Sequence, residues 1–145
     1  MLFRSPGRHR DTIQRYHDGA RVVVTGRVPA VTPYVQQAAV CIAPLVSGAG
    51  WRNKVIQYAA WRRPCVVTPI AAEDVMLDAQ QDFFVARDPS EFAARVLELL
   101  LDPDRARSMA EQAREKVLTL YDNRRIVHVG MNSIYRALEN GGDGQ

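Results

Sequence analysis

The chain has 145 residues, which suits one compact domain with a usable core and leaves little room for two. Hydrophobic residues make up 47% and charged residues 24%, a globular composition that excludes a disordered or fibrous chain. The longest uncharged apolar run, Ala38–Val46, is too short to span a bilayer, and the first residues lack the apolar segment of a signal peptide. We therefore expect a cytoplasmic protein.

Charge is distributed unevenly along the chain. Residues 1–70 carry ten Arg or Lys against two Asp or Glu, a net charge of +8, and residues 71–145 carry nine against fourteen, a net charge of −5. A basic half attracts phosphates or nucleic acid. However, 17 of the 19 cations are arginines, they are not interleaved with aromatic residues, and no nucleic-acid-binding motif is present. We expect no nucleic-acid partner.

The cysteines and histidines do not form a recognisable site. Cys41 and Cys65 lie inside apolar runs, which indicates reduced core residues and not a disulfide or a metal site. His9, His17 and His128 have no metal-like spacing and no nearby cysteine. We expect no metal.

Strands and helices alternate through the first half of the chain. A weak helical pattern covers residues 8–17, and the β-branched run at residues 21–25 predicts a short strand. Thr32 followed by proline predicts a helix with Thr32 as its N-cap. Residues 39–43 are continuously apolar, which is typical of a strand buried on both faces of a parallel sheet.

The middle of the chain continues this alternation. A glycine turn at residues 47–50 precedes a predicted helix over residues 51–61, and strands are predicted at residues 65–68 and 82–86. The apolar stripe of the predicted helix consists of Val55, Tyr58 and Ala59.

The last third is predicted to be helical, with Asp88, Asp102 and Asp122 at the starts of three helices. The side chains expected to point inward are Phe92, Val96, Leu99 and Leu100 on the first helix, Met109, Ala113, Val117 and Leu120 on the second, and Val127, Met131, Ile134 and Leu138 on the third. Short buried strands separated by helices predict a single Rossmann-like α/β domain with a parallel sheet, which binds ligands beyond the carboxyl ends of its strands.

The glycine turn is the most informative local motif. Gly48 and Gly50 let a ligand approach the backbone, and the helix that follows presents unsatisfied N–H groups and a partial positive charge. Arg52 and Lys54 add cations in the first turn. This combination suits a phosphate or diphosphate, although an ordinary turn has the same local pattern.

Several motifs in order resemble the donor half of retaining GT-B glycosyltransferases of the family-4 group. They are Val23–Val28, Pro33–Val35, Ala39–Leu45, Gly50–Ala60 with Arg63–Thr68, Ala72–Asp74, and Asp88-Pro89 with Phe92. The run Gly50–Thr68 is similar to the G-x-x-N-K-V-L-E-A-M-A … P-V-V block of bacterial sugar transferases linked to exopolysaccharide systems. The resemblance covers about residues 20–135.

This resemblance implies that the domain binds a nucleotide-diphosphate sugar and that the whole enzyme transfers the sugar with retention to a glycan or lipid-linked acceptor. The resemblance further implies that Lys54 neutralises the departing diphosphate with Arg52 as a helper, and that Glu73 lies near the donor sugar. The resemblance implies that Gly48, Ala49 and Gly50 face the diphosphate, that Gln57 is at the ribose, and that Gly26, Arg27 and Val28 lie beside the base. It also implies that Ser47 and Asn53 bind the donor. The family needs no metal and no cofactor. The implied domains are a truncated first βα unit (1–19), the nucleotide-sugar-binding domain (20–140) and a tail (141–145).

The chain also departs from the family pattern. Gln57 replaces the glutamate that holds the donor ribose, Ala49 occupies the place of the first acid, and Ala71 and Asp74 replace glycines around Glu73. Set against the family pattern, we expect this chain to lack the N-terminal acceptor domain and to keep only its first three residues of the first strand. We therefore expect the chain to be inactive alone.

Alternative interpretations stay open. A catalytically inactive GT-B remnant or interaction domain is the main alternative, and a GT-B epimerase is a third. Lys54 and Arg52 also fit solvated surface residues, Gln57 a polar residue at a cleft edge, and Glu73 an acid at a helix start. The expected partners are the donor, the missing acceptor domain, a second copy through an incomplete sheet edge, and a membrane surface only in the full-length enzyme.

Overall fold

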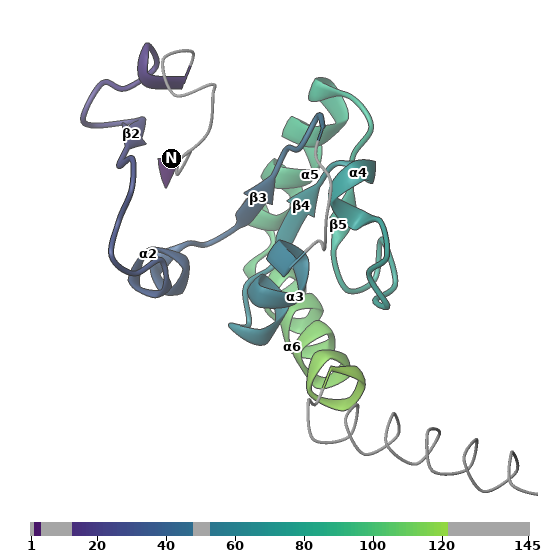
Figure 1. The fold of residues 1–145 in the computed structure, drawn as a ribbon. Helices are drawn as coiled ribbons and strands as arrows, with labels where there is room; N and C mark the ends of the chain where they lie inside the picture. Colours follow the sequence, from purple (N-terminus) through teal and green to yellow (C-terminus); the bar gives the residue numbers. More distant parts are fainter. Residues whose placement is uncertain (1, 4–12, 48–52, 122–145) are drawn as a thin grey trace, which may run out of the picture. The chain divides into compact units, whose positions relative to one another are not determined.

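The structure is a computed structural model of the full chain, and it describes residues 2–3, 13–47 and 53–121. The chain divides into two compact units, residues 1–38 and residues 39–145, which are described separately (Figure 1). No helix of the described residues is long and apolar enough to cross a membrane.

The first unit contains a two-stranded parallel sheet and one helix. Strand β1 (Leu2–Phe3) pairs with β2 (Val23–Val24), which confirms a short strand in the predicted region. Helix α2 (Thr32–Gln37) has proline in its first turn as predicted, but Thr32 is not its N-cap. Val31 takes that place with a backbone that is already helical, and no side chain caps the helix. The helix therefore begins one residue too early for the Thr32 hydroxyl to cap it.

The second unit contains a three-stranded parallel sheet in the order β3-β4-β5. Strands β3 (Cys41–Ala43), β4 (Cys65–Val67) and β5 (Phe84–Val85) lie within the three predicted runs. Cys41 is in register with Cys65, and Val66 is in register with Phe84. The helices of this unit are α3 (Asn53–Ala60), α4 (Pro69–Ala72), α5 (Pro89–Leu101) and α6 (Pro103–Leu120). This arrangement confirms the predicted α/β class.

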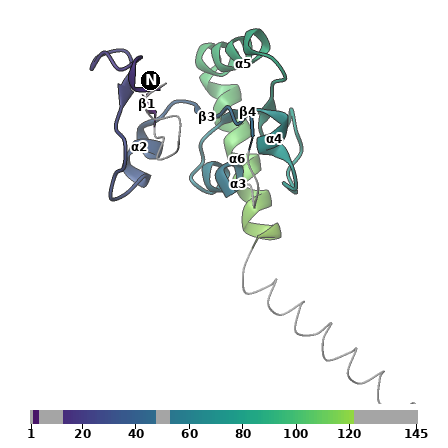
Figure 2. The ribbon, with the colours of Figure 1, turned by 45° about the horizontal axis from the view of Figure 1, so that its top comes forward.

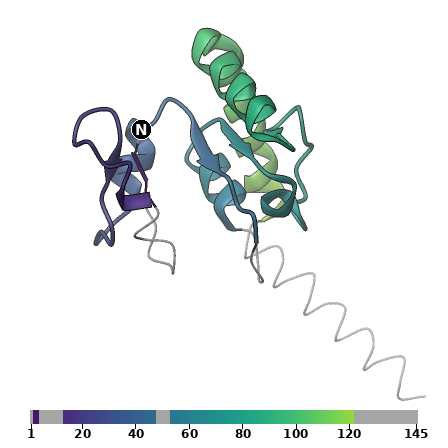
Figure 3. The same ribbon diagram turned by 90° about the horizontal axis from the view of Figure 1, so that it is seen from above.

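Helices cover both faces of this sheet because successive side chains of a strand point to opposite sides. Val66 and Phe84 point to the face covered by α5 and the start of α6, where they pack with Leu99, Ala106 and Met109. Cys41 and Cys65 point to the other face, beneath Tyr58 of α3. Figures 1 and 3 show α3 and α5 on opposite sides of the strands.

The predicted helix ends are largely confirmed, and two predicted core positions are wrong. Asp88 caps α5 by accepting hydrogen bonds from the N–H groups of Ser90 and Glu91, and Asp102 caps α6 by accepting one from the N–H group of Arg105. Leu100 is exposed because it lies at the margin of the helical stripe of α5. Leu120 is exposed because it is the last residue of α6, beyond the last buried position, Val117. Helix α4 was not predicted. The helix expected after Asp122 and the first half of the one expected over residues 8–17 lie outside the described residues.

Candidate functional site

The carboxyl edge of the β3-β4-β5 sheet is formed by the segments that follow each strand. Thr68, directly after β4, donates its hydroxyl hydrogen to the carbonyl oxygen of Leu45 at 2.6 Å, in the segment after β3. The backbone N–H of Thr68 donates to the carbonyl oxygen of Ala43 at 3.3 Å. Two loops that are far apart in sequence are thereby held side by side. Ser47 lies two residues beyond Leu45 on this edge and is exposed.

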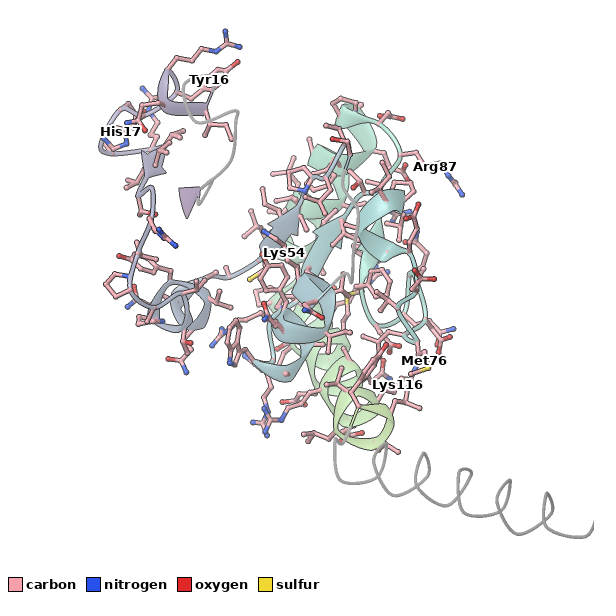
Figure 4. All side chains as sticks on the ribbon, viewed as in Figure 1. Tyr16, His17, Lys54, Met76, Arg87 and Lys116 are labelled. Carbon is pink, nitrogen blue, oxygen red and sulfur yellow. The ribbon has the colours of Figure 1, made fainter. Side chains whose placement is uncertain are left out.

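Helix α3 carries three of the candidate residues with their side chains accessible to solvent. Asn53, Lys54 and Gln57 are exposed, while Val55 and Ala59 on the opposite side of the helix are buried. This division confirms the predicted apolar stripe. Figure 4 shows Lys54 at the first turn of α3, well away from Met76 and Lys116.

Contacts along its buried side and at its end hold α3 in position. The Tyr58 hydroxyl lies 3.4 Å from the Ile42 carbonyl oxygen, and the Arg114 guanidinium donates to the carbonyl oxygen of Ala60. Burial raises the pKa of the Cys41 thiol to about 11 and that of the Tyr58 hydroxyl to about 12. Burial also raises the pKa of the Cys65 thiol. All three groups therefore stay neutral, and the thiols are poor nucleophiles and metal ligands near pH 7.

Glu73 lies at the carboxyl edge after β4, but not at a helix start. It follows the last residue of the four-residue helix α4 as its C-cap, so the interpretation of Glu73 as an acid at a helix N-terminus is wrong. Its side chain is exposed. Asp74 has a φ of 59°, a left-handed conformation that favours glycine. The family glycine at this position therefore matches the backbone conformation, and Asp74 adopts it at a cost.

The residues expected beside the base lie in the first unit. Gly26 has a φ of 64°, which explains the glycine at this turn, and Arg27 is exposed beside the half-buried Val28. The preceding strand β2 is held by His17, whose Nδ1 accepts a hydrogen bond from the Val24 N–H at 2.9 Å. Gly26, Arg27 and Val28 are therefore described only within residues 1–38.

Several candidates lie outside the described residues, namely Gly48, Ala49, Gly50 and Arg52. Among the residues that the structure describes, no group of three or more His, Cys, Asp or Glu side chains is placed to hold a metal ion.

One residue of this edge was missed by the sequence analysis. Thr68 stood out only as the last residue of a β-branched strand, and its hydroxyl bonds a carbonyl 23 residues earlier. The one local feature that could have indicated this role is the position of Thr68 between a buried strand and a proline. The carboxyl edge thus carries an exposed primary amine on α3, an exposed carboxylate after α4 and two loops tied together by Thr68, and the amine is able to pair with an anion.

The chain belongs to the family described as Glycosyl transferases group 1, whose model matches residues 4–102. It is also similar to the solved structure of a sucrose-phosphate synthase from Thermosynechococcus elongatus, with 20% sequence identity and a TM-score of 0.75. That match covers 97% of this chain and 39% of the synthase chain, and it shows that the fold is a Rossmann-like half of a GT-B fold. No curated protein sequence matches the chain significantly.

Proposed function

We propose that this member of the group 1 glycosyl transferases binds a nucleotide-diphosphate sugar at the carboxyl edge of its sheet. In a complete retaining enzyme it passes the sugar to a glycan or lipid-linked acceptor, as in bacterial exopolysaccharide assembly in the cytoplasm. The observation that carries this proposal is the exposed Lys54 in the first turn of α3, in a chain whose family transfers glycosyl groups.

The chemistry assigned to each residue follows from charge and position. Departure of a nucleoside diphosphate leaves negative charge on its phosphate oxygens, and a fixed cation beside them stabilises that charge as it develops. Lys54 supplies the cation, and Arg52, two residues earlier in the sequence, assists. The α3 backbone N–H groups favour the same anion, which offsets the unfavourable placement of cations at a helix N-terminus.

The remaining roles are polar and positional. Gln57 lies on the exposed side of α3 one turn after Asn53, where its amide oxygen accepts a hydrogen bond from a ribose hydroxyl. Glu73 contacts the donor sugar, and Gly26, Arg27 and Val28 contact the base. Cations and backbone N–H groups perform the electrostatic work, so the reaction needs neither a metal nor a cofactor. An acceptor domain completes the enzyme.

The test is a thermal-unfolding series of the purified chain with UDP, GDP, ADP and CMP. A nucleotide at about 100 times its dissociation constant stabilises the folded state by roughly 2.7 kcal/mol. We expect one nucleoside diphosphate to raise the melting temperature clearly, and CMP, which lacks a second phosphate, to have little effect. The responding nucleotide identifies the base of the donor.

Two variants assign this effect to the site. Lys54→Ala removes the proposed cation and should abolish the shift. Arg107→Ala removes one positive charge from an exposed position on α6 and should preserve it, because Arg107 forms only an exposed ion pair with Asp104. If no nucleotide stabilises a well-folded protein, the donor-binding proposal fails and the inactive remnant becomes the better interpretation.

A further inference from the structure

Thr68 stands where a threonine normally caps a helix, but its hydroxyl is used elsewhere. It directly precedes the four-residue helix α4, with a φ of −81° and a ψ of 162°. A threonine with this extended backbone ordinarily accepts a hydrogen bond from an N–H group in the first helical turn. Thr68 makes no such side-chain bond to α4. The usual local role of a threonine at a helix start therefore does not account for this residue.

The hydroxyl of Thr68 reaches the segment that follows the neighbouring strand. It donates to the carbonyl oxygen of Leu45 at 2.6 Å, whereas the carbonyl oxygen of Ala43 lies 3.5 Å away. The Ala43 carbonyl already accepts from the backbone N–H groups of Thr68 and Leu45, at 3.3 Å and 2.9 Å. The backbone bond of Thr68 thus continues the β3-β4 sheet, and its side chain holds a point two residues beyond the end of β3.

The two segments joined by this bond lead to different residues of the carboxyl edge. From Leu45 the chain reaches Ser47 within two residues. From Thr68 the single turn of α4 leads directly to its C-cap, Glu73, and Ala71 within that turn is only 2% exposed. Figures 1 and 2 show α4 beside the strands of the sheet. Because α4 is short and packed, the place of Glu73 is set by the place of Thr68.

A ligand that contacts both segments depends on their separation, and a ligand that contacts one of them does not. In the proposed site, the donor diphosphate binds on the side of Ser47 and Lys54, and the donor sugar binds at Glu73. A nucleoside diphosphate therefore meets one side, whereas a nucleotide sugar meets both. Two contacts within one ligand reinforce each other only where the geometry allows both at once, and a misplacement on the order of 1 Å loses much of this gain.

We infer that Thr68 is a positioning residue for the donor, whose hydroxyl holds the segment after β3 and Glu73 at the separation that a nucleotide sugar requires. The inference rests on the proposed donor-binding function. Thr68 acts through Leu45 and through α4 and does not touch the donor. Its hydroxyl therefore governs the binding of the nucleotide sugar relative to that of the nucleoside diphosphate.

Calorimetric titration of the purified full chain tests this role. The titrants are UDP, GDP and ADP, followed by the glucose, mannose and N-acetylglucosamine conjugates of the nucleotide that binds. Thr68→Val keeps the size and branching of the side chain and removes the hydroxyl. It should keep the Kd of the nucleoside diphosphate within about twofold and weaken the tightest nucleotide sugar by at least about fivefold. Thr68→Ala also lacks the hydroxyl and should act in the same way.

Two variants assign the effect to this hydroxyl. Thr68→Ser retains the hydroxyl and should bind the nucleotide sugar within about twofold of the unmodified chain. Thr119→Val makes the same chemical change on α6, where the threonine hydroxyl donates to the Glu115 carbonyl oxygen of its own helix at 3.0 Å. It should change neither affinity. Circular dichroism verifies that each variant is folded.

The possible outcomes separate this inference from the proposed function. The inference alone is overturned if Thr68→Val binds both ligands as the unmodified chain does, if it weakens both equally, or if Thr68→Ser acts like Thr68→Val. Equal weakening would show that the hydroxyl serves only the fold. The inference also fails if Glu73→Gln leaves the affinity for every nucleotide sugar unchanged, because Glu73 then does not contact the sugar. If no nucleotide binds, the proposed function itself fails, and this inference fails with it.

Discussion

The two edges of the β3-β4-β5 sheet differ in how they use their polar side chains, and the two lysines of the chain show the difference. Lys54, at the first turn of α3, is exposed. Lys116, on α6 near the amino edge, donates hydrogen bonds to Asp78 at 2.6 Å and to Asp82 at 2.8 Å. Figure 4 shows Lys116 beside Met76 and far from Lys54.

The amino edge is closed by further long-range contacts. Asp82 is only 2% exposed, and it also accepts a hydrogen bond from the Asp78 N–H. The Met76 N–H donates to the Tyr121 hydroxyl oxygen at 2.8 Å. Helix α6 thus fastens the segment before β5, while the carboxyl edge keeps its amine and carboxylate accessible. With the proposed function, the stabilising contacts and the donor site would lie at opposite ends of the same strands.

Alkaline pH should lower the free energy of unfolding more than any other change, because the buried ionisable groups cluster under α3 toward the amino edge. The raised pKa values of Cys41 and Tyr58 mean that the unfolded chain releases these protons first, from pH 9 for the thiol. Below pH 9 both states hold these protons, and the groups do not lower the free energy of unfolding. As the pH rises toward 11 and 12, the unfolded chain loses them more easily than the folded chain, and stability falls. Cys41 alone should cost about 2 kcal/mol by pH 11, measured by urea unfolding.

A matched variant identifies the source of this loss. Cys41→Ala removes the thiol while keeping an apolar residue in β3, and it should reduce the slope of stability against pH between 9 and 11. A wild-type stability that stays constant from pH 8 to 11 would contradict the burial of these groups.

Exchanging each lysine for methionine tests whether the lysine at the amino edge stabilises the fold more than the lysine at the carboxyl edge. Lys116→Met leaves the Asp82 carboxylate buried without its cation and should lower the free energy of unfolding by about 2 kcal/mol. Lys54→Met should change it by less than about 0.5 kcal/mol, because Lys54 is exposed. Urea unfolding at pH 7 measures both. Equal losses for the two variants would show that the edges do not differ in this way.

The pH dependence of the Lys116 contribution follows from its contacts. Hydrogen bonds from Lys116 to Asp78 and Asp82 raise the pKa of its ammonium group above 10.5. The stabilisation is therefore complete below pH 10.5 and disappears as the pH rises through the higher folded value.

Local signals predicted the parts of the fold that depend on neighbouring residues. The apolar run at residues 39–43 and the β-branched residues 65–68 indicated buried strands, and Asp88 before proline indicated the start of α5. The same signals located Lys54 and its neighbours on α3. The strands lie in the predicted runs because burial on both faces of a sheet demands continuous apolar residues.

The features that were not predicted depend on distant partners or on very short elements. The Thr68 hydroxyl bonds a loop 23 residues earlier, and Lys116 meets Asp82 34 residues before it. No local periodicity encodes such contacts. Leu100 followed the helical period yet is exposed, because the period defines a stripe and not the width of the surface beneath it. Helix α4 has only four residues, too few to show a period.

One residue near each edge has a left-handed backbone, and substitutions there should change the free energy of unfolding by the smallest amounts. Arg62, two residues after the end of α3, has a φ of 54°, and the next N–H, that of Arg63, donates to the Tyr58 carbonyl oxygen. Asp74 has a φ of 59° after α4. Arg62→Gly should raise the free energy of unfolding by about 0.5–1 kcal/mol, because glycine adopts this conformation without a Cβ clash. Asp74→Gly should gain less, below about 0.5 kcal/mol, since aspartate tolerates the left-handed region better than arginine.

Alanine variants separate this backbone effect from the loss of a side chain. Arg62→Ala keeps a Cβ and should change stability little, whereas Asp74→Ala should lose about 0.5 kcal/mol because alanine lacks the local hydrogen bonding that lets aspartate adopt this conformation. Urea unfolding of the four variants ranks them directly. If both glycine variants destabilise the protein, the side chains of Arg62 and Asp74 contribute more than the backbone strain costs. The left-handed turn at the carboxyl edge would then be a stabilising feature, and the division of roles between the two edges would have to be abandoned.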